Sequence, residues 1–119
     1  MYGLPKNIDL SFFKGMELEL ISFGPAQIQF YFSGGIHIGL GGKLSHSSRG
    51  KDSVWEEGVP LVVAGSLLSL IGSSITSVAG LPDGTLTLCF ANQEVLVLYD
   101  DSSHYESYTI RHGDDLFVV

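Results

Sequence analysis

The sequence predicts a mainly β (α+β) fold: two antiparallel three-stranded β-meanders related by an internal duplication, plus one short helix. Three observations predict it. Apolar and polar residues alternate with a period of two over most of the chain, as they do in strands with one buried face. Turn sequences rich in Gly and Pro separate the alternating segments. The two halves can be overlaid at a spacing of 57–58 residues.

The chain has 119 residues and a mass of 12.8 kDa, which is the size of one domain. We therefore treat 1–119 as a single domain. Along it we expect a first β-meander over 15–41, a loop over 43–59, a short helix over 60–71, a second β-meander over 74–100 and C-terminal strands over 105–119.

The first meander, 15–41, shows the alternation clearly. Leu18 and Leu20 alternate with glutamates, so this strand has one apolar and one polar face. The turn sequences Gly24-Pro25 and Ser33-Gly34-Gly35 bound the strand that follows. This pattern predicts an antiparallel meander with one buried face.

The middle of the chain has a different character. The stretch 43–59 is polar and serine-rich around one aromatic residue, Trp55, which predicts a long loop. Pro60 near the start and Gly72 just past the end favour a short helix over 60–71.

The second meander repeats the pattern of the first. Pro82-Asp83-Gly84 is a turn signal, and Leu86, Leu88 and Phe90 alternate with polar residues after it. The segment 94–99 is apolar on both faces, which is typical of a central strand. The expected core consists of Leu18, Leu20, Ile28, Phe30, Phe32, Ile38, Leu67, Leu70, Leu86, Leu88, Phe90, Leu96 and Leu98.

The overlay of the halves favours a duplication. Gly15 falls on Gly72 and Pro25 on Pro82, and the same overlay places Ser45-His46 on Ser103-His104. Any two meanders resemble each other in alternation, so that explanation stays open. The matches at Gly and Pro favour duplication because these residues mark specific turns.

The composition excludes several classes of protein. Cys89 is the only cysteine, which rules out an internal disulfide framework and a cysteine-based zinc module. A net charge of −7 disfavours binding to nucleic-acid phosphates. The longest apolar run, 61–71, is broken by Gly and Ser and is too short for a membrane span. We see no signal peptide at the N-terminus, so we expect a cytoplasmic protein that does not bind membranes.

The charge is distributed unevenly. Residues 1–51 carry five basic and three acidic residues, a net +2, whereas residues 52–119 carry ten acidic residues against Arg111, a net −9. One interpretation is a surface that attracts a basic protein partner; the other is that acidic turns keep an apolar domain in solution. The candidate partner-binding residues, with Tyr and Trp as interface anchors, are Trp55, Glu56, Glu57, Asp100, Asp101, Tyr105, Glu106, Tyr108, Asp114 and Asp115.

No motif predicts catalysis, a metal ion or a cofactor. His46 and His104 occupy matched positions, but a metal site needs further ligands. Cys89 lies inside a strand and not at a helix N-terminus, where reactive cysteines are commonly found. Adjacent acids such as Asp100 and Asp101 point to opposite faces of a strand and do not form a dyad. We therefore expect a protein that is not an enzyme.

Several motifs resemble a family of small uncharacterised bacterial domains. They are Leu10-Ser11-Phe12, Gly15-x-Glu17-Leu18, Phe23-Gly24-Pro25, Phe32-Ser33-Gly34-Gly35, Leu70-Ile71-Gly72, Asp83-Gly84-Thr85-Leu86 and Tyr105-Glu106-Ser107-Tyr108. The resemblance covers most of the chain and brings no activity or catalytic residue with it. In size and charge the chain also looks like an immunity protein of a contact-dependent or polymorphic toxin system. This likeness implies neutralisation of a cognate toxin domain, for example a nuclease with a basic cleft.

Two other classes remain open. The chain can be a small structural module that oligomerises by pairing a strand edge with itself. An enzyme would require a cleft that gathers His46, His104 and an acid.

Overall fold

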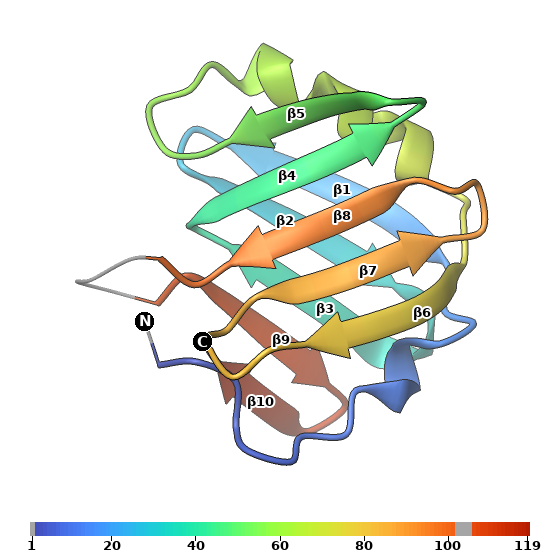
Figure 1. Cartoon of the computed structure of the whole chain (residues 1–119), viewed down its shortest axis with the longest axis vertical. Helices are drawn as coiled ribbons and strands as arrows, with labels where there is room; N and C mark the ends of the chain where they lie inside the picture. Colours follow the sequence, from blue (N-terminus) through green and yellow to red (C-terminus); the bar gives the residue numbers. More distant parts are fainter. Residues whose placement is uncertain (1, 102–105) are drawn as a thin grey trace.

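The computed structural model describes residues 2–101 and 106–119 and is mainly β, as the sequence predicts (Figure 1). The strands are β1 (Leu18–Gly24), β2 (Gln27–Phe32), β3 (Ile36–Leu40), β4 (Lys43–Ser48), β5 (Lys51–Trp55), β6 (Ile75–Gly80), β7 (Leu86–Phe90), β8 (Val95–Tyr99), β9 (Tyr108–His112) and β10 (Asp115–Val118). The helical segments are 3₁₀ helices: η1 (Ser11–Phe13), η2 (Ser33–Gly35) and η3 (Leu61–Leu70). None of the helices in the described residues is long and apolar enough to cross a bilayer.

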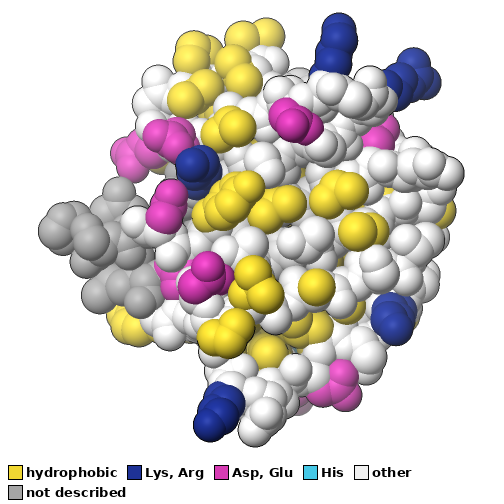
Figure 2. Space-filling model, in the orientation of Figure 1, with side chains coloured by type: hydrophobic (Ala, Val, Ile, Leu, Met, Phe, Trp, Pro, Cys, Tyr) yellow, Lys and Arg dark blue, Asp and Glu magenta, His cyan; other side chains and the backbone are white. Residues whose placement is uncertain are grey.

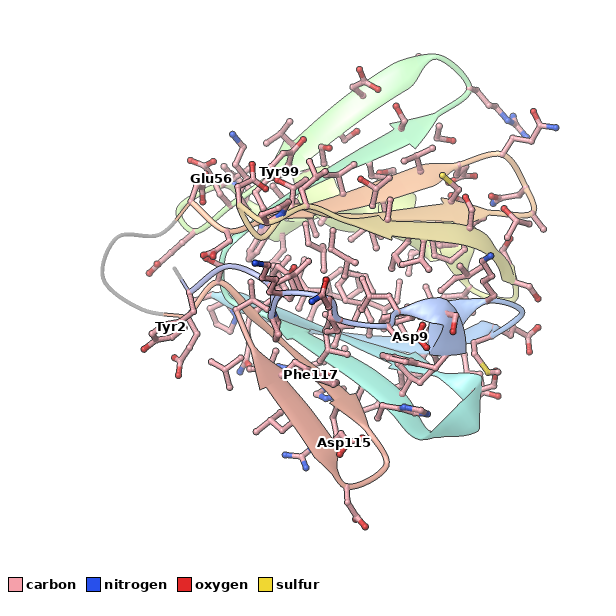
Figure 3. All side chains as sticks on the ribbon, turned by 60° about the horizontal axis from the view of Figure 1, so that its bottom comes forward. Tyr2, Asp9, Glu56, Tyr99, Asp115 and Phe117 are labelled. Atoms are coloured by element: carbon pink, nitrogen blue, oxygen red, sulfur yellow. The ribbon has the colours of Figure 1, made fainter. Side chains whose placement is uncertain are left out.

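The strands form two antiparallel sheets of five, with the core side chains between them (Figure 3). The first sheet has the order β1-β2-β3-β9-β10 and the second β5-β4-β8-β7-β6. Both predicted meanders are present, and each has gained a two-stranded hairpin. The hairpin comes from the other half of the chain in both cases, because β9 pairs with β3 and β4 pairs with β8.

The backbone hydrogen bonds show an approximate two-fold symmetry between the halves. The Gly15 amide donates to the Ile75 carbonyl at 2.8 Å, and the Gly72 amide donates to the Leu18 carbonyl at 2.8 Å. Each residue in one bond lies 57 positions from its counterpart in the other. Gly15 and Gly72 both have positive φ, of 81° and 89°, a conformation that glycine adopts without strain. The predicted duplication is thus visible in the backbone.

The prediction that Leu20 is a core residue was wrong, because of a β-bulge that occurs in both halves of the chain. A β-bulge shifts the register of β1 between Leu18 and Leu20, so Leu20 is 55% exposed and Ile21 takes the inward position. The same shift occurs at the equivalent place in β6, between Ile75 and Ser77. The other expected core residues are all buried.

The predicted loop over 43–59 was also wrong, because most of it is the hairpin β4–β5. Leu44 and His46 point inward between serines, so β4 keeps the period of two despite its polar composition. Arg49 and Gly50 join the strands with φ of 52° and 78°, the positive values that a two-residue type I′ turn requires.

The predicted helix over 60–71 is present as η3, with 3₁₀ geometry. Its buried residues Ala64, Leu67 and Leu70 are spaced every three residues, which matches the three residues per turn of a 3₁₀ helix. The helix packs against β1, β4 and β5, so it covers one open side between the two sheets.

The sheets are joined at the end of the molecule where both chain termini lie (Figure 1). Tyr108 in β9 is buried, and its hydroxyl donates to the Gly84 carbonyl beside β7 at 2.6 Å. Asp100 accepts hydrogen bonds from the Gly3 amide at 2.6 Å and the Ser107 hydroxyl at 2.8 Å. A Cβ on Gly84 would lie 2.4 Å from the Cβ of Asp100, so only glycine fits there.

Tyr108→Phe is expected to lower the free energy of unfolding by about 1–2 kcal/mol, because the buried Gly84 carbonyl loses its donor. Urea denaturation followed by circular dichroism measures the change. Tyr31→Phe is the control, since Tyr31 is 38% exposed, and it should alter stability by less than about 0.5 kcal/mol. Equal effects of the two substitutions would contradict the role given to Tyr108.

Candidate functional site

Six of the thirteen acidic residues gather at the end of the molecule described above, which we call the acidic end. Four segments meet there: the ends of β5 and β8 and the starts of β7 and β9. Figure 2 shows Asp and Glu side chains at this edge of the visible face. Among the described residues, the acidic end comprises Glu56, Glu57, Asp83, Asp100, Asp101 and Glu106.

Asp100 differs from its neighbours in the acidic end because it is partly buried. Its carboxylate holds the N-terminal segment and the start of β9 through Gly3 and Ser107. Asp101 and Glu106 are exposed, as is Glu56, which lies beside Tyr99 in Figure 3. Glu57 and Asp83 are exposed as well, so five of the six carboxylates of the acidic end reach solvent.

Asp114 and Asp115 do not belong to the acidic end. They lie in and just after the turn between β9 and β10, at the opposite end of the first sheet, and Figure 3 shows Asp115 well apart from Glu56. The sequence pattern grouped Asp114 and Asp115 with the other candidate acids on one surface. The structure separates them, because β9 carries the chain from one end of the sheet to the other.

The aromatic residues also differ from expectation. Trp55 and Tyr108 are each only 1% exposed, so neither presents an anchor to a partner. The Trp55 indole N–H donates to the Val59 carbonyl at 3.1 Å, and its ring belongs to the core. The polar groups of both Trp55 and Tyr108 thus form hydrogen bonds inside the protein. Tyr105 lies outside the described residues.

A second constellation lies at the far end of the second sheet, and we call it the polar cluster. It consists of His46 in β4, Ser66 and Ser69 in η3, and Asn92 and Glu94 in the turn before β8. The sequence pattern singled out His46, as a metal ligand or as part of an enzyme cleft with His104 and an acid, but it did not connect His46 with the other four residues. The available signal was the buried position of His46 in the alternation of β4, but its partners come from distant segments.

The polar cluster is centred on a histidine–carboxylate pair. His46 Nε2 lies 2.5 Å from Glu94 Oε1, and His46 Nδ1 lies 2.9 Å from the Ser66 hydroxyl. His46 is 1% exposed and Glu94 is 8% exposed. Ser69 donates to Glu94 Oε1 at 2.6 Å, and Asn92 donates to Glu94 Oε2 at 3.0 Å. The carboxylate therefore accepts hydrogen bonds on both oxygens.

These hydrogen bonds determine the charge of Glu94. Burial by itself would raise the pKa of the Glu94 carboxyl, but hydrogen bonds from Ser69 and His46 and the coulombic attraction of His46 outweigh it, and the pKa lies below its usual value. An ionised Glu94 accepts only, so His46 Nε2 carries a proton toward it. In neutral His46, Nδ1 is then the acceptor and Ser66 the donor.

A surface hollow of about 390 Å³ opens above the polar cluster. Ser48, Arg49, Gly65, Ser66, Ser69 and Glu94 line it. The Ser66 side chain therefore joins a buried histidine to a solvent-accessible space.

His46 and His104 are not equivalent, contrary to the overlay of the halves. His46 pairs with Leu96 in β8, and the symmetric pairing joins Ile110 to Ile38 in β3. The counterpart of His46 is thus Ile110, and the spacing has grown to 64 residues because the connection from β8 to β9 is longer than the one from β3 to β4. His104 lies outside the described residues.

In the part of the chain that the structure describes, no group of three or more His, Cys, Asp or Glu side chains is arranged to hold a metal ion. Comparison of the chain with protein-family models, with curated proteins and with solved structures finds no match.

Glu94 is expected to make stability depend on pH on the acid side. Its folded-state pKa is depressed, so its contribution is present above the ordinary value of 4.5 and is lost as the pH falls through the lower folded-state value. We expect Glu94→Gln to be less stable than wild type at about pH 7 and the difference to shrink toward about pH 3. Urea denaturation of both proteins across this range measures it. A difference that is constant with pH would contradict the assignment.

Proposed function

We propose that this protein binds a basic protein partner through the acidic end and does so without catalysis. The observation that supports it is the convergence of six acidic residues from three separate stretches of the sequence, 56–57, 83 and 100–106. The mutual repulsion of these like charges opposes folding. A partner of opposite charge would relieve that repulsion when it binds. The position of the charges, more than their number, supports the proposal.

The exposed acidic residues suit an encounter driven by electrostatic attraction. Charges at the rim of an interface mainly raise the association rate and discourage partners of the wrong sign. Lys43, paired with Tyr99 across β4 and β8 and lying 5.2 Å from the centre of its ring, borders the acidic end and offsets little of its charge.

The finer proposal is that the protein is a bacterial immunity protein that acts in the cytoplasm on a cognate toxin domain. Its support is the size of the chain, its acidic end and the resemblance stated above. A gene for a toxin directly upstream is the expected context. Co-expression with that gene tests it: cells should survive with the wild-type protein and die without it, and death in both cases would refute the immunity function.

Neutralising Glu56→Gln, Asp101→Asn and Glu106→Gln together should slow association with that toxin domain by about tenfold or more at low salt. It should also flatten the dependence of the association rate on ionic strength, because the attraction that salt screens has been removed. Surface plasmon resonance at several salt concentrations measures both quantities.

The matched control is the pair Asp114→Asn and Asp115→Asn, at the opposite end of the first sheet. It also removes acidic charge but should leave the association rate nearly unchanged. If both variants slow association equally, net charge is responsible and the acidic end is not the interface. Self-association through a strand edge stays a prediction for sedimentation analysis.

A further inference from the structure

The polar cluster lies in the second sheet, and the first sheet has an apolar counterpart of it. By the pairing of the strands, His46 corresponds to Ile110 and Glu94 to Ile36. Both isoleucines are buried, at 0% and 2% exposure. The first sheet therefore has two isoleucines at the positions where the second sheet has a histidine and a carboxylate.

The fold does not need a histidine and a carboxylate at these positions. A buried ion pair is often no more stable than apolar residues of similar volume, because its desolvation offsets the attraction. The first sheet, with Ile36 and Ile110, shows that apolar packing is compatible with the backbone at these positions. Packing alone does not explain the presence of His46 and Glu94.

The hollow above the polar cluster has the same asymmetric origin. Ser69 lies 57 positions after Phe12, and Ser48 lies 64 positions before His112. The Phe12 and His112 rings stack with their centroids 4.2 Å apart. Two small serines replace this stacked pair in the other half, where Ser48 and Ser69 line the hollow. The side chains that would cover Ser66 are thus absent.

From this geometry we propose a second activity, apart from binding at the acidic end and contrary to the expectation that the chain is not an enzyme: Ser66 is an activated nucleophile in a Ser66–His46–Glu94 relay that hydrolyses small acyl esters. His46 Nε2–H donates a hydrogen bond to the Glu94 carboxylate at 2.5 Å, which leaves Nδ1 to accept a hydrogen bond from the Ser66 hydroxyl at 2.9 Å. A nucleophile, a base and a group that orients the base are the parts that such a relay requires. Ser66 and His46 are the catalytic residues, and Glu94 is a positioning residue.

The chemical step balances within the relay and its substrate. The Ser66 oxygen forms a bond to the carbonyl carbon of an ester while its proton passes to His46 Nδ1. The bond from that carbon to the leaving oxygen then breaks, and the leaving oxygen takes the proton from Nδ1. Water repeats both steps on the acylated serine, which releases the acid and restores Ser66. The imidazolium formed in each step lies beside the Glu94 carboxylate, which stabilises it.

The hollow limits the class of substrate. A space of about 390 Å³ admits a small acyl group and not a folded polypeptide segment. Arg49 lines the same hollow, and its guanidinium favours substrates that carry an anionic group. We therefore expect small, preferably anionic, acyl esters to react.

Labelling with a fluorophosphonate tests the nucleophile directly, because the reagent forms a phosphorus–oxygen bond with an activated serine and releases fluoride. We expect one adduct on the intact wild-type protein, located at Ser66 by peptide mass spectrometry, and hydrolysis of p-nitrophenyl acetate above the rate in buffer. Ser66→Ala should lose both. Ser77→Ala, on an exposed position of β6, is the control and should retain both. Absence of an adduct at Ser66 in the wild-type protein would overturn the proposal.

The double variant His46→Ile and Glu94→Ile copies the other half of the molecule and tests the relay apart from the fold. We expect it to remain folded, as judged by its circular dichroism spectrum and melting temperature, and to be labelled at Ser66 at least about a hundredfold more slowly. Glu94→Gln should slow labelling and move the pH–rate profile to lower pH, because the imidazolium loses its carboxylate. Labelling at the wild-type rate in the double variant, or its failure to fold, would overturn the relay.

Discussion

The pairing of β3 with β9 and of β8 with β4 is the interaction on which the rest of the structure depends. Each half of the chain makes a three-stranded meander and a hairpin, but the hairpin completes the sheet of the other half. Without the exchange, each meander would present an unpaired edge at its third strand, which costs hydrogen bonds and invites association. The exchange also fixes the two sites, since β9 brings Glu106 to the acidic end and β4 brings His46 under η3.

The alternation of side chains was sufficient to predict the two meanders and their core. It failed at Leu20, because a bulge inserts one residue into the strand. The side chains after the bulge therefore point to the face opposite to the one that simple alternation predicts. It failed at 43–59 because serine is common both in loops and on the solvent-facing side of strands, so the serine-rich composition does not distinguish the two. In β4 the serines occupy only the outward positions, and the inward ones remain Leu44 and His46.

The candidate sites were harder to predict than the fold. The acidic end was partly predicted from the uneven charge, yet Asp114 and Asp115 lie elsewhere because a strand of five residues separates the two ends of the sheet. Trp55 and Tyr108 are buried, which their types alone do not reveal. The polar cluster joins residues up to 48 positions apart, and only the three-dimensional pairing brings His46 to Glu94.

The exchange of hairpins has a consequence for synthesis on the ribosome. The strands β3 and β9 are separated by most of the chain, so the first sheet cannot be completed until nearly all of the protein has emerged. Until then the first half exposes an apolar meander with an open edge, and contacts of such long sequence separation form slowly. The nascent chain therefore passes through a stage in which it depends on dilution or chaperones to avoid association with its neighbours.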